Sequence, residues 1–104
     1  MFSQIRQFFG GGPAVDYRSL QREGALIIDV RSESEFNAGH LGAARNVPLS
    51  ELLGYAEKLP KDKPLILCCA SGIRSATARK LLQSKGFSRV YNGGGWQSLR
   101  SKLQ

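Results

Sequence analysis

The chain of 104 residues is long enough for one domain with a modest core, and its 41% hydrophobic and 22% charged residues are typical of a globular protein. No stretch approaches the roughly 18 consecutive apolar residues of a membrane-spanning helix, so we expect no membrane partner. The net charge is +7, but the basic residues are dispersed and accompany no nucleic-acid-binding motif, so we expect no nucleic-acid partner either.

Residues 1–12 are expected to form an N-terminal lead-in segment, followed by a single domain at residues 13–104. Four apolar side chains in the segment are interrupted by polar ones, which makes it too short and too polar for the hydrophobic region of a signal peptide. The segment leads into three glycines and a proline. Its aromatic side chains could dock on the domain or on a partner.

Short apolar runs alternate with helix-like segments along the rest of the chain, which predicts an α/β domain with a mainly parallel sheet. The five predicted strands lie at residues 14–15, at 25–30, within the loop 39–48, at 65–68 and at 90–91. The predicted helices are 16–22, a short helix that begins at the Ser32–Glu35 capping box, a helix capped by Ser50, 74–85 and 96–103. Residues 60–64 and 93–95 are expected to be turns.

The two cysteines, Cys68 and Cys69, are adjacent in the chain. A disulfide between neighbours is strained and links no distant segments, so we expect two free thiols. A zinc site would need more ligands than these and His40, which is the only histidine. We therefore expect no metal and no cofactor, and the free thiols favour a reducing compartment such as the cytoplasm.

The segment from Leu65 to Ala76 is expected to be a buried strand, a short loop with one glycine and the start of a helix. In open α/β sheets, sites form at the carboxyl ends of strands, where the N-termini of helices point. The free N–H groups and the helix dipole there favour a thiolate, which is the nucleophilic form of cysteine. Strand alternation turns Cys68 into the packing, so Cys69 is the candidate nucleophile.

The charge of the chain is concentrated around this candidate. Residues 1–62 hold seven Lys and Arg against eight Asp and Glu, whereas residues 63–104 hold eight Lys and Arg and no acid. A site in the second stretch therefore lies in a positive field that attracts anions. The simpler interpretation is a solvated basic face.

The loop resembles the active-site loop of the rhodanese family, with four residues between Cys69 and Arg74. Three further segments resemble the family in the same order along the chain: Ile28-Asp29-Val30-Arg31 with Glu35-Phe36; Gly39-His40-Leu41, Gly42-Ala43 and Asn46-Val47-Pro48; and Gly86-Phe87, Val90, Asn92 and Gly94-Gly95-Trp96. The resemblance covers the chain from about Pro13 to its end. It implies a single-domain rhodanese with three layers, α/β/α, around a central, mainly parallel five-stranded sheet.

By this resemblance, the protein is a sulfurtransferase of the thiosulfate:cyanide type. The Cys69 thiolate takes sulfane sulfur from a small anionic donor such as thiosulfate, or from a protein persulfide, and passes it to a thiol or to cyanide. The persulfide on Cys69 would lie among the amides of a substrate-binding loop. The residues of that loop are Ala70, Ser71, Gly72, Ile73, Arg74 and Ser75.

The roles of the charged and polar side chains around the loop stay open at this point. Arg74 could line the loop or fold back to brace it, and Ser75 could hydrogen-bond the sulfur or cap the helix. Asp29 could fix the loop or Arg74, or act within its own turn, and Arg31 is a further supporting candidate. Glu35 matches a pocket-wall position, but its capping box alone explains it.

Two other functions are weighed against this one. Related cysteine phosphatases and arsenate reductases have one more residue between cysteine and arginine, and no acid follows Asp62 here that could protonate a leaving oxygen. A sulfur-carrier or protein-docking module without significant turnover is the stronger alternative. Many rhodaneses have Arg where this chain has Ala70, and two-domain members have cations in place of Glu35 and Ser71. The pocket therefore lacks the side-chain cations that hold a sulfonate, so thiosulfate stays the default assay donor and a protein persulfide is the alternative.

Overall fold

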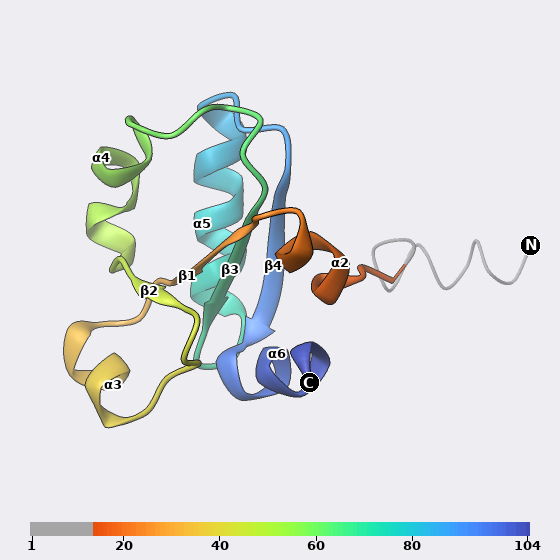
Figure 1. The fold of residues 1–104 in the computed structure, drawn as a ribbon. Coiled ribbons are helices and arrows are strands. Elements are labelled where there is room, and N and C mark those ends of the chain that lie inside the picture. The colour runs from red at the N-terminus through yellow and green to blue at the C-terminus, as the bar shows by residue number, and fades with distance from the viewer. Residues whose placement is uncertain (1–13) are drawn as a thin grey trace, which may run out of the picture.

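The computed structural model describes residues 14–104, so the expected lead-in at residues 1–12 lies outside the described residues. Four parallel strands form one sheet in the order β2-β1-β3-β4. The strands are β1 (Leu26–Asp29), β2 (Arg45–Asn46), β3 (Leu65–Cys69) and β4 (Val90–Gly95). Strand β3 lies between β1 and β4, in the interior of the sheet (Figure 1).

Helices cover both faces of the sheet, which confirms the predicted three-layer α/β/α architecture (Figure 1). Helices α2 (Tyr17–Arg22) and α6 (Trp96–Leu103) lie on one face, and α4 (Leu52–Ala56) and α5 (Ile73–Ser84) lie on the other. The 3-10 turn η1 (Leu49–Glu51) leads into α4, and α3 (Glu33–Ala38) lies at the end of the sheet where β3 stops.

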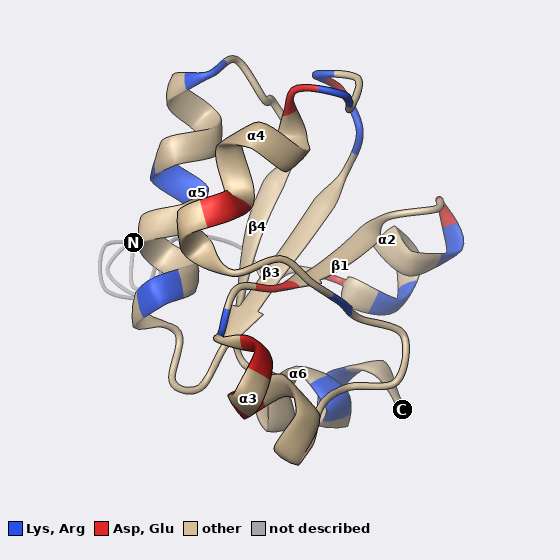
Figure 2. Ribbon diagram, turned by 90° about the vertical axis from the view of Figure 1, so that its left-hand side faces the viewer, with Lys and Arg blue, Asp and Glu red and all other residues tan. Residues whose placement is uncertain are grey.

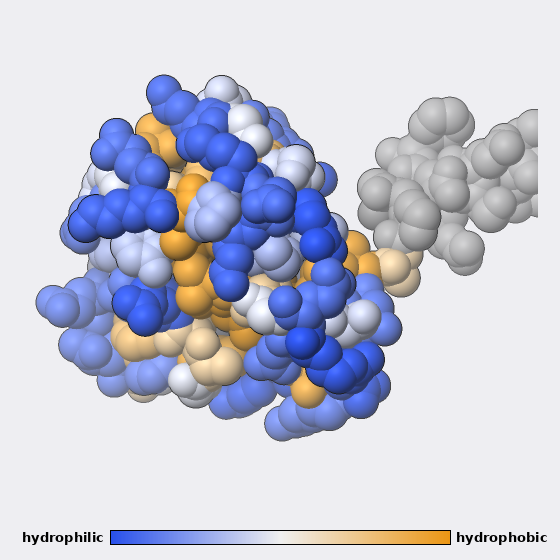
Figure 3. Space-filling model, turned by 45° about the horizontal axis from the view of Figure 1, so that its top comes forward, coloured by the Kyte–Doolittle hydropathy of each residue, from blue (hydrophilic) through white to orange (hydrophobic). Residues whose placement is uncertain are grey.

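The surface carries its charges unevenly. Helix α5 presents Lys and Arg and no acid, whereas α3 presents Glu, and both reach the same end of the molecule (Figure 2). The face shown in Figure 3 is mostly hydrophilic, with a narrow hydrophobic strip between charged side chains. Among residues 14–104, no helix is both long enough and apolar enough to span a bilayer.

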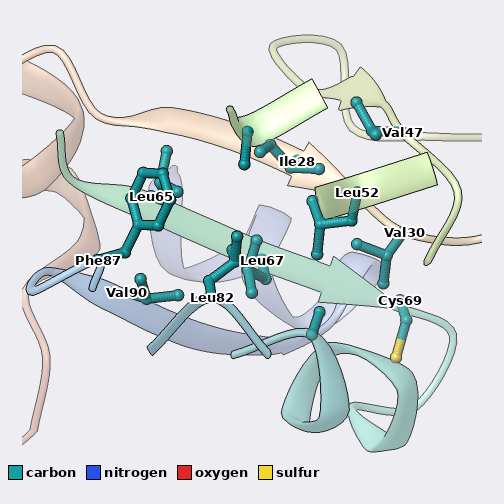
Figure 4. Close-up of a cluster of buried hydrophobic side chains, with 12 residues drawn as sticks. Ile28, Val30, Val47, Leu52, Leu65, Leu67, Cys69, Leu82, Phe87 and Val90 are labelled. Carbon is teal, nitrogen blue, oxygen red and sulfur yellow. The ribbon is translucent and has the colours of Figure 1, made fainter. Parts of the chain in front are cut away.

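Strand β3 is buried on both faces and divides the core in two. Leu65, Leu67 and Cys69 pack with the side chains under α4 and α5 (Figure 4). Ile66 and Cys68 pack on the other face, with the side chains under α2 and α6. All five residues are buried, which is why the strand has an uninterrupted apolar sequence. The alternation confirms that Cys68 lies in the packing, on the face opposite Cys69.

The predicted fifth strand at residues 14–15 is wrong. Asp16 caps α2 through a 3.0 Å hydrogen bond from the Ser19 N–H to its carboxylate, so the chain turns into the helix immediately after Val15. Ala14 and Val15 are exposed and lie beside Tyr91 of the edge strand β4, without backbone pairing to it.

The glycines at 93–95 belong to β4 and do not form the predicted turn. Two of them, Gly93 and Gly95, are needed because neighbouring backbone comes very close. A Cβ atom on Gly95 would lie 2.8 Å from the carbonyl oxygen of Ala70, and one on Gly93 would lie 3.0 Å from that of Leu67. A run of glycine in a strand can therefore signal close packing of main chains as well as a turn.

Smaller boundaries also differ from the sequence prediction. Ser50 does not cap a helix, because the Glu51 N–H bonds to the Pro48 carbonyl at 2.8 Å and closes a 3-10 turn that begins before Ser50. The capping box of α3 is confirmed. In α5, Leu82 is buried as expected, whereas Leu81 is only half-buried.

We expect Leu82→Ala to lower the free energy of unfolding by about 2–5 kcal/mol, because truncation of this fully buried side chain leaves a cavity between α5 and the sheet. Urea unfolding followed by circular dichroism measures the change. Gln83→Ala, on the exposed side of the same helix, is the matched control and should change stability by no more than about 0.5 kcal/mol. Equal effects of the two substitutions would contradict this description of the core.

Candidate active site

The thiol of Cys69 lies in a ring of hydrogen-bonding groups at the end of β3. Its Sγ accepts a hydrogen bond from the Gly72 N–H at 2.9 Å and another from the Ser75 N–H at 3.4 Å. The Ser75 hydroxyl also lies 3.4 Å from the sulfur. The sulfur points toward the first turn of α5 (Figure 4), where the partial positive charge of the helix end lies. The structure therefore brings together Cys69, Gly72 and Ser75, as the sequence predicted.

The backbone of the loop is held in this shape by two glycines. Gly72 has a φ of +101°, a left-handed conformation that side chains disfavour, and it immediately precedes α5. Gly95 lets the Ala70 carbonyl approach β4. The sequence predicted one glycine in this loop but indicated neither its left-handed φ nor the need for Gly95.

The two thiols have opposite acidities. Burial raises the pKa of Cys69, but the hydrogen bonds from Ser75, Ser71 and Gly72 outweigh that effect and bring the pKa below its ordinary value. Burial raises the pKa of Cys68 to about 12, with the nearby Asp29 carboxylate acting in the same direction. At neutral pH, Cys68 is therefore an inert thiol and Cys69 has the enhanced thiolate character of a nucleophile.

Asn92 on β4 connects the parts of the loop, and the sequence prediction assigned it no role. Its Nδ2 donates to the Gly72 carbonyl at 3.1 Å. Its Oδ1 accepts from the Gly94 N–H at 2.9 Å and from the Ser75 hydroxyl at 2.6 Å. The sequence signals were its place among the residues that resemble the family and its position just before three glycines.

The hydroxyl of Ser75 has one proton and two possible acceptors for it, Asn92 Oδ1 and Cys69 Sγ. While Asn92 Oδ1 holds that proton, the hydroxyl cannot also donate it fully to the Cys69 sulfur. Of the two roles considered for Ser75, the structure shows contact with the sulfur and not a helix cap. Its backbone N–H is the donor that stays directed at Sγ whichever way the hydroxyl turns.

Arg74 braces the loop against α3. Its guanidinium donates to both oxygens of Glu35, at 2.7 and 2.9 Å, while the same carboxylate accepts from the Ser32 N–H in the capping box at 3.1 Å. The capping-box role considered for Glu35 is confirmed, and the ion pair with Arg74 is added to it. Arg74 and Ser32 hold the pKa of Glu35 at about 2, so the pair stays charged at all ordinary pH values.

Asp29 and Arg31 form a separate, buried pair. The Arg31 guanidinium donates to both carboxylate oxygens of Asp29, and its Nη2 also donates to the Gly39 carbonyl at 2.7 Å. The Arg31 N–H bonds to Asp29 as well, so Asp29 acts within its own turn rather than on Arg74. The charges of this pair act on Cys68, on the far face of the sheet from the candidate nucleophile.

The remaining loop residues turn their side chains outward. Ala70 and Ser71 are exposed, and Ile73 is 75% exposed, which is unusual for a large apolar side chain. They contribute the backbone around Cys69 rather than side-chain contacts to its sulfur. Among the described residues, no group of three or more His, Cys, Asp and Glu gathers as a metal site.

The comparisons with known proteins agree with this geometry. Residues 14–102 match the rhodanese-like domain. The chain belongs to the rhodanese family. Thiosulfate sulfurtransferase GlpE of Pseudomonas fluorescens is 31% identical over 90 residues, which are 86% of this chain and 83% of GlpE. The uncharacterized protein YqhL of Bacillus subtilis is 38% identical over 90 residues, covering 86% of this chain and 71% of YqhL.

A solved structure in the family is similarly organised. The human single-domain sulfurtransferase TSTD1 is 29% identical to this rhodanese and has a TM-score of 0.69, over 89% of this chain and 99% of that one. The sequence-based recognition of a single-domain rhodanese is therefore confirmed, with four strands in the described sheet instead of the five expected.

Alkylation of Cys69 by iodoacetamide should rise with pH through a midpoint below that of an unperturbed cysteine thiol. The reason is that the hydrogen bonds in the loop lower the pKa of Cys69. Intact mass at each pH gives the rate. Cys68 should stay unmodified in the folded protein, because it is buried and its pKa is about 12. A midpoint above the ordinary value would contradict the assigned donors.

Asn92→Asp should raise that midpoint by about one pH unit or more, because a carboxylate adds negative charge beside the sulfur and holds the Ser75 proton more tightly. The same alkylation series measures the shift. Asn37→Asp, on the exposed side of α3, changes the charge equally and should leave the midpoint in place. Equal midpoints for Asn92→Asp and the unaltered protein would show that Asn92 does not influence the Cys69 thiol.

Proposed function

We propose that this rhodanese is a sulfurtransferase that carries sulfane sulfur as a persulfide on Cys69. The observation that supports this most is the donation of backbone N–H groups to a buried thiol whose pKa they lower. The same groups suit a terminal persulfide sulfur, because they stabilise negative charge without any side chain having to move. A relative of this chain is named thiosulfate sulfurtransferase, which supports the same reaction class.

In the first step, the Cys69 thiolate attacks the outer sulfur of a donor such as thiosulfate. A bond forms between Cys69 Sγ and that sulfur, the sulfur–sulfur bond of thiosulfate breaks, and sulfite leaves with the bonding pair. The charge is conserved, since thiolate and thiosulfate give a persulfide anion and sulfite. With an organic persulfide as donor, the leaving group is a thiolate.

The enzyme-bound sulfur then lies against the backbone of Ala70 to Ser75, the proposed substrate-binding loop. In the second step, cyanide or a thiol attacks the terminal sulfur and releases the Cys69 thiolate, so that the enzyme alternates between two covalent states. Arg31 and Asp29 support the fold beside the loop, and Glu35 with Arg74 fixes its position. No cofactor takes part in either step.

A sulfur-carrier or docking module is the second candidate function. The 75% exposure of Ile73, on the loop that surrounds Cys69, favours it because an apolar side chain at the site entrance suits a protein partner. Both functions use a Cys69 persulfide, and they differ in whether free small molecules are turned over. The two free, buried thiols are consistent with the cytoplasm as the proposed location.

Incubation with thiosulfate or with an alkyl persulfide should add the mass of one sulfur atom to the protein, and a thiol reductant should remove it. The added atom is the persulfide sulfur, and intact-mass spectrometry detects it. Cys69→Ser should abolish the gain, because it removes the attacking thiolate.

Cys68→Ser is the matched control, since it changes the neighbouring thiol and should retain the gain. Loading of Cys69→Ser, or no loading of the unaltered protein by either donor, would refute the proposed function. Loading without thiocyanate production from cyanide would favour the carrier module over the enzyme.

A further inference from the structure

The loop around Cys69 contains one side-chain cation, Arg74, and it is already paired. The ion pair with Glu35 is bidentate, with both nitrogen–oxygen distances below 3 Å. Such paired hydrogen bonds between guanidinium and carboxylate are among the strongest polar contacts in proteins. A bound donor therefore meets a neutral pair at this position and not a free positive charge.

The pair is partly exposed on the loop that carries the buried thiol. The side chains of Arg74 and Glu35 are 38% and 37% exposed, and Arg74 lies in the first turn of α5, toward which the Cys69 sulfur points. The hydrogen bonds to Glu35 raise the pKa of Arg74, and the charge of Cys69 acts in the same direction. The guanidinium is thus close enough to the sulfur to sense its charge.

The effect of the Arg74–Glu35 ion pair on donor binding depends on the charge of the donor. Thiosulfate brings two negative charges to the site, and its sulfonate would be held best by a free guanidinium. Arg31 cannot replace Arg74, because it is 5% exposed and bound to Asp29 on the other face of the sheet. An alkyl persulfide is attacked in its neutral, protonated form, which carries no sulfonate and does not need the missing cation.

We propose that Glu35 is a specificity-determining residue that withholds Arg74 from anionic donors, so that the site takes sulfur from an organic persulfide in preference to thiosulfate. This inference rests on the proposed function of Cys69. The reaction with the persulfide forms a bond between Cys69 Sγ and its outer sulfur, breaks the donor's sulfur–sulfur bond and releases the donor thiolate. One negative charge is present before and after the step.

The test compares kcat/KM for thiosulfate and for a small alkyl persulfide without ionic groups, with cyanide as acceptor. In the unaltered protein the persulfide should be preferred. Glu35→Gln should raise the ratio of thiosulfate to persulfide about tenfold, because it frees the guanidinium of Arg74 for the sulfonate. The amide oxygen of Gln can still accept from the Ser32 N–H, so the capping box of α3 is retained.

Glu33→Gln is the matched control, since it removes the same charge from the same helix. Glu33 is exposed and forms no ion pair within the described part of the chain, so its substitution should leave the ratio unchanged. The double variant Glu35→Gln with Arg74→Gln should lose the tenfold gain, because the gain requires the released guanidinium.

The outcomes separate this inference from the proposed function. If neither donor loads Cys69, the proposed function fails. If both donors load it but Glu35→Gln leaves the ratio unchanged, or if Glu33→Gln raises it as much, only the role of Glu35 is refuted. Should Glu35→Gln be too unstable to assay, a wild-type preference for thiosulfate would refute the inference by itself.

Discussion

The hydrogen bonds from backbone N–H groups to Cys69 Sγ are the interaction on which the rest of the site depends. They exist because β3 delivers the thiol to the start of α5 and Gly72 adopts a left-handed φ of +101° in between. Gly95 allows β4 to approach the Ala70 carbonyl, and Asn92 ties Gly72 and Ser75 to that strand. The central sheet thus fixes the loop, and a buried sulfur that would otherwise prefer to be neutral acquires thiolate character.

The two arginines near the loop each form an ion pair with a carboxylate. Arg31 is bound to Asp29 on one face of the sheet, and Arg74 is bound to Glu35 at the entrance on the other. The net charge of +7 therefore describes the chain as a whole and not the immediate surroundings of Cys69. In the proposed mechanism main-chain groups stabilise the persulfide, whereas the proposed choice of donor depends on which cations are free. These are separate properties, and different residues control them.

The sequence was sufficient to predict a parallel α/β sheet and the different settings of the two cysteines, because both follow from local patterns, and the family resemblance added the three layers. Continuous apolar residues predicted the buried β3, and alternation along it separated Cys68 from Cys69. Contacts between distant segments could not be predicted in the same way. How β4 and α3 approach the loop determines the roles of Asn92 and Gly95 and the pairing of Arg74 with Glu35. The strand expected at residues 14–15 does not form, because Asp16 caps α2 directly after it.

In the proposed cycle Cys69 alternates between a thiolate and a persulfide held by the same backbone groups. Initial-velocity kinetics with an alkyl persulfide and cyanide, together with isolation of the sulfur-loaded protein, is the decisive measurement. Parallel double-reciprocal lines are expected, and one equivalent of thiocyanate when cyanide is added to the isolated loaded protein. Intersecting lines, with no thiocyanate released from the loaded protein, would show direct transfer between the two substrates and rule out the persulfide cycle.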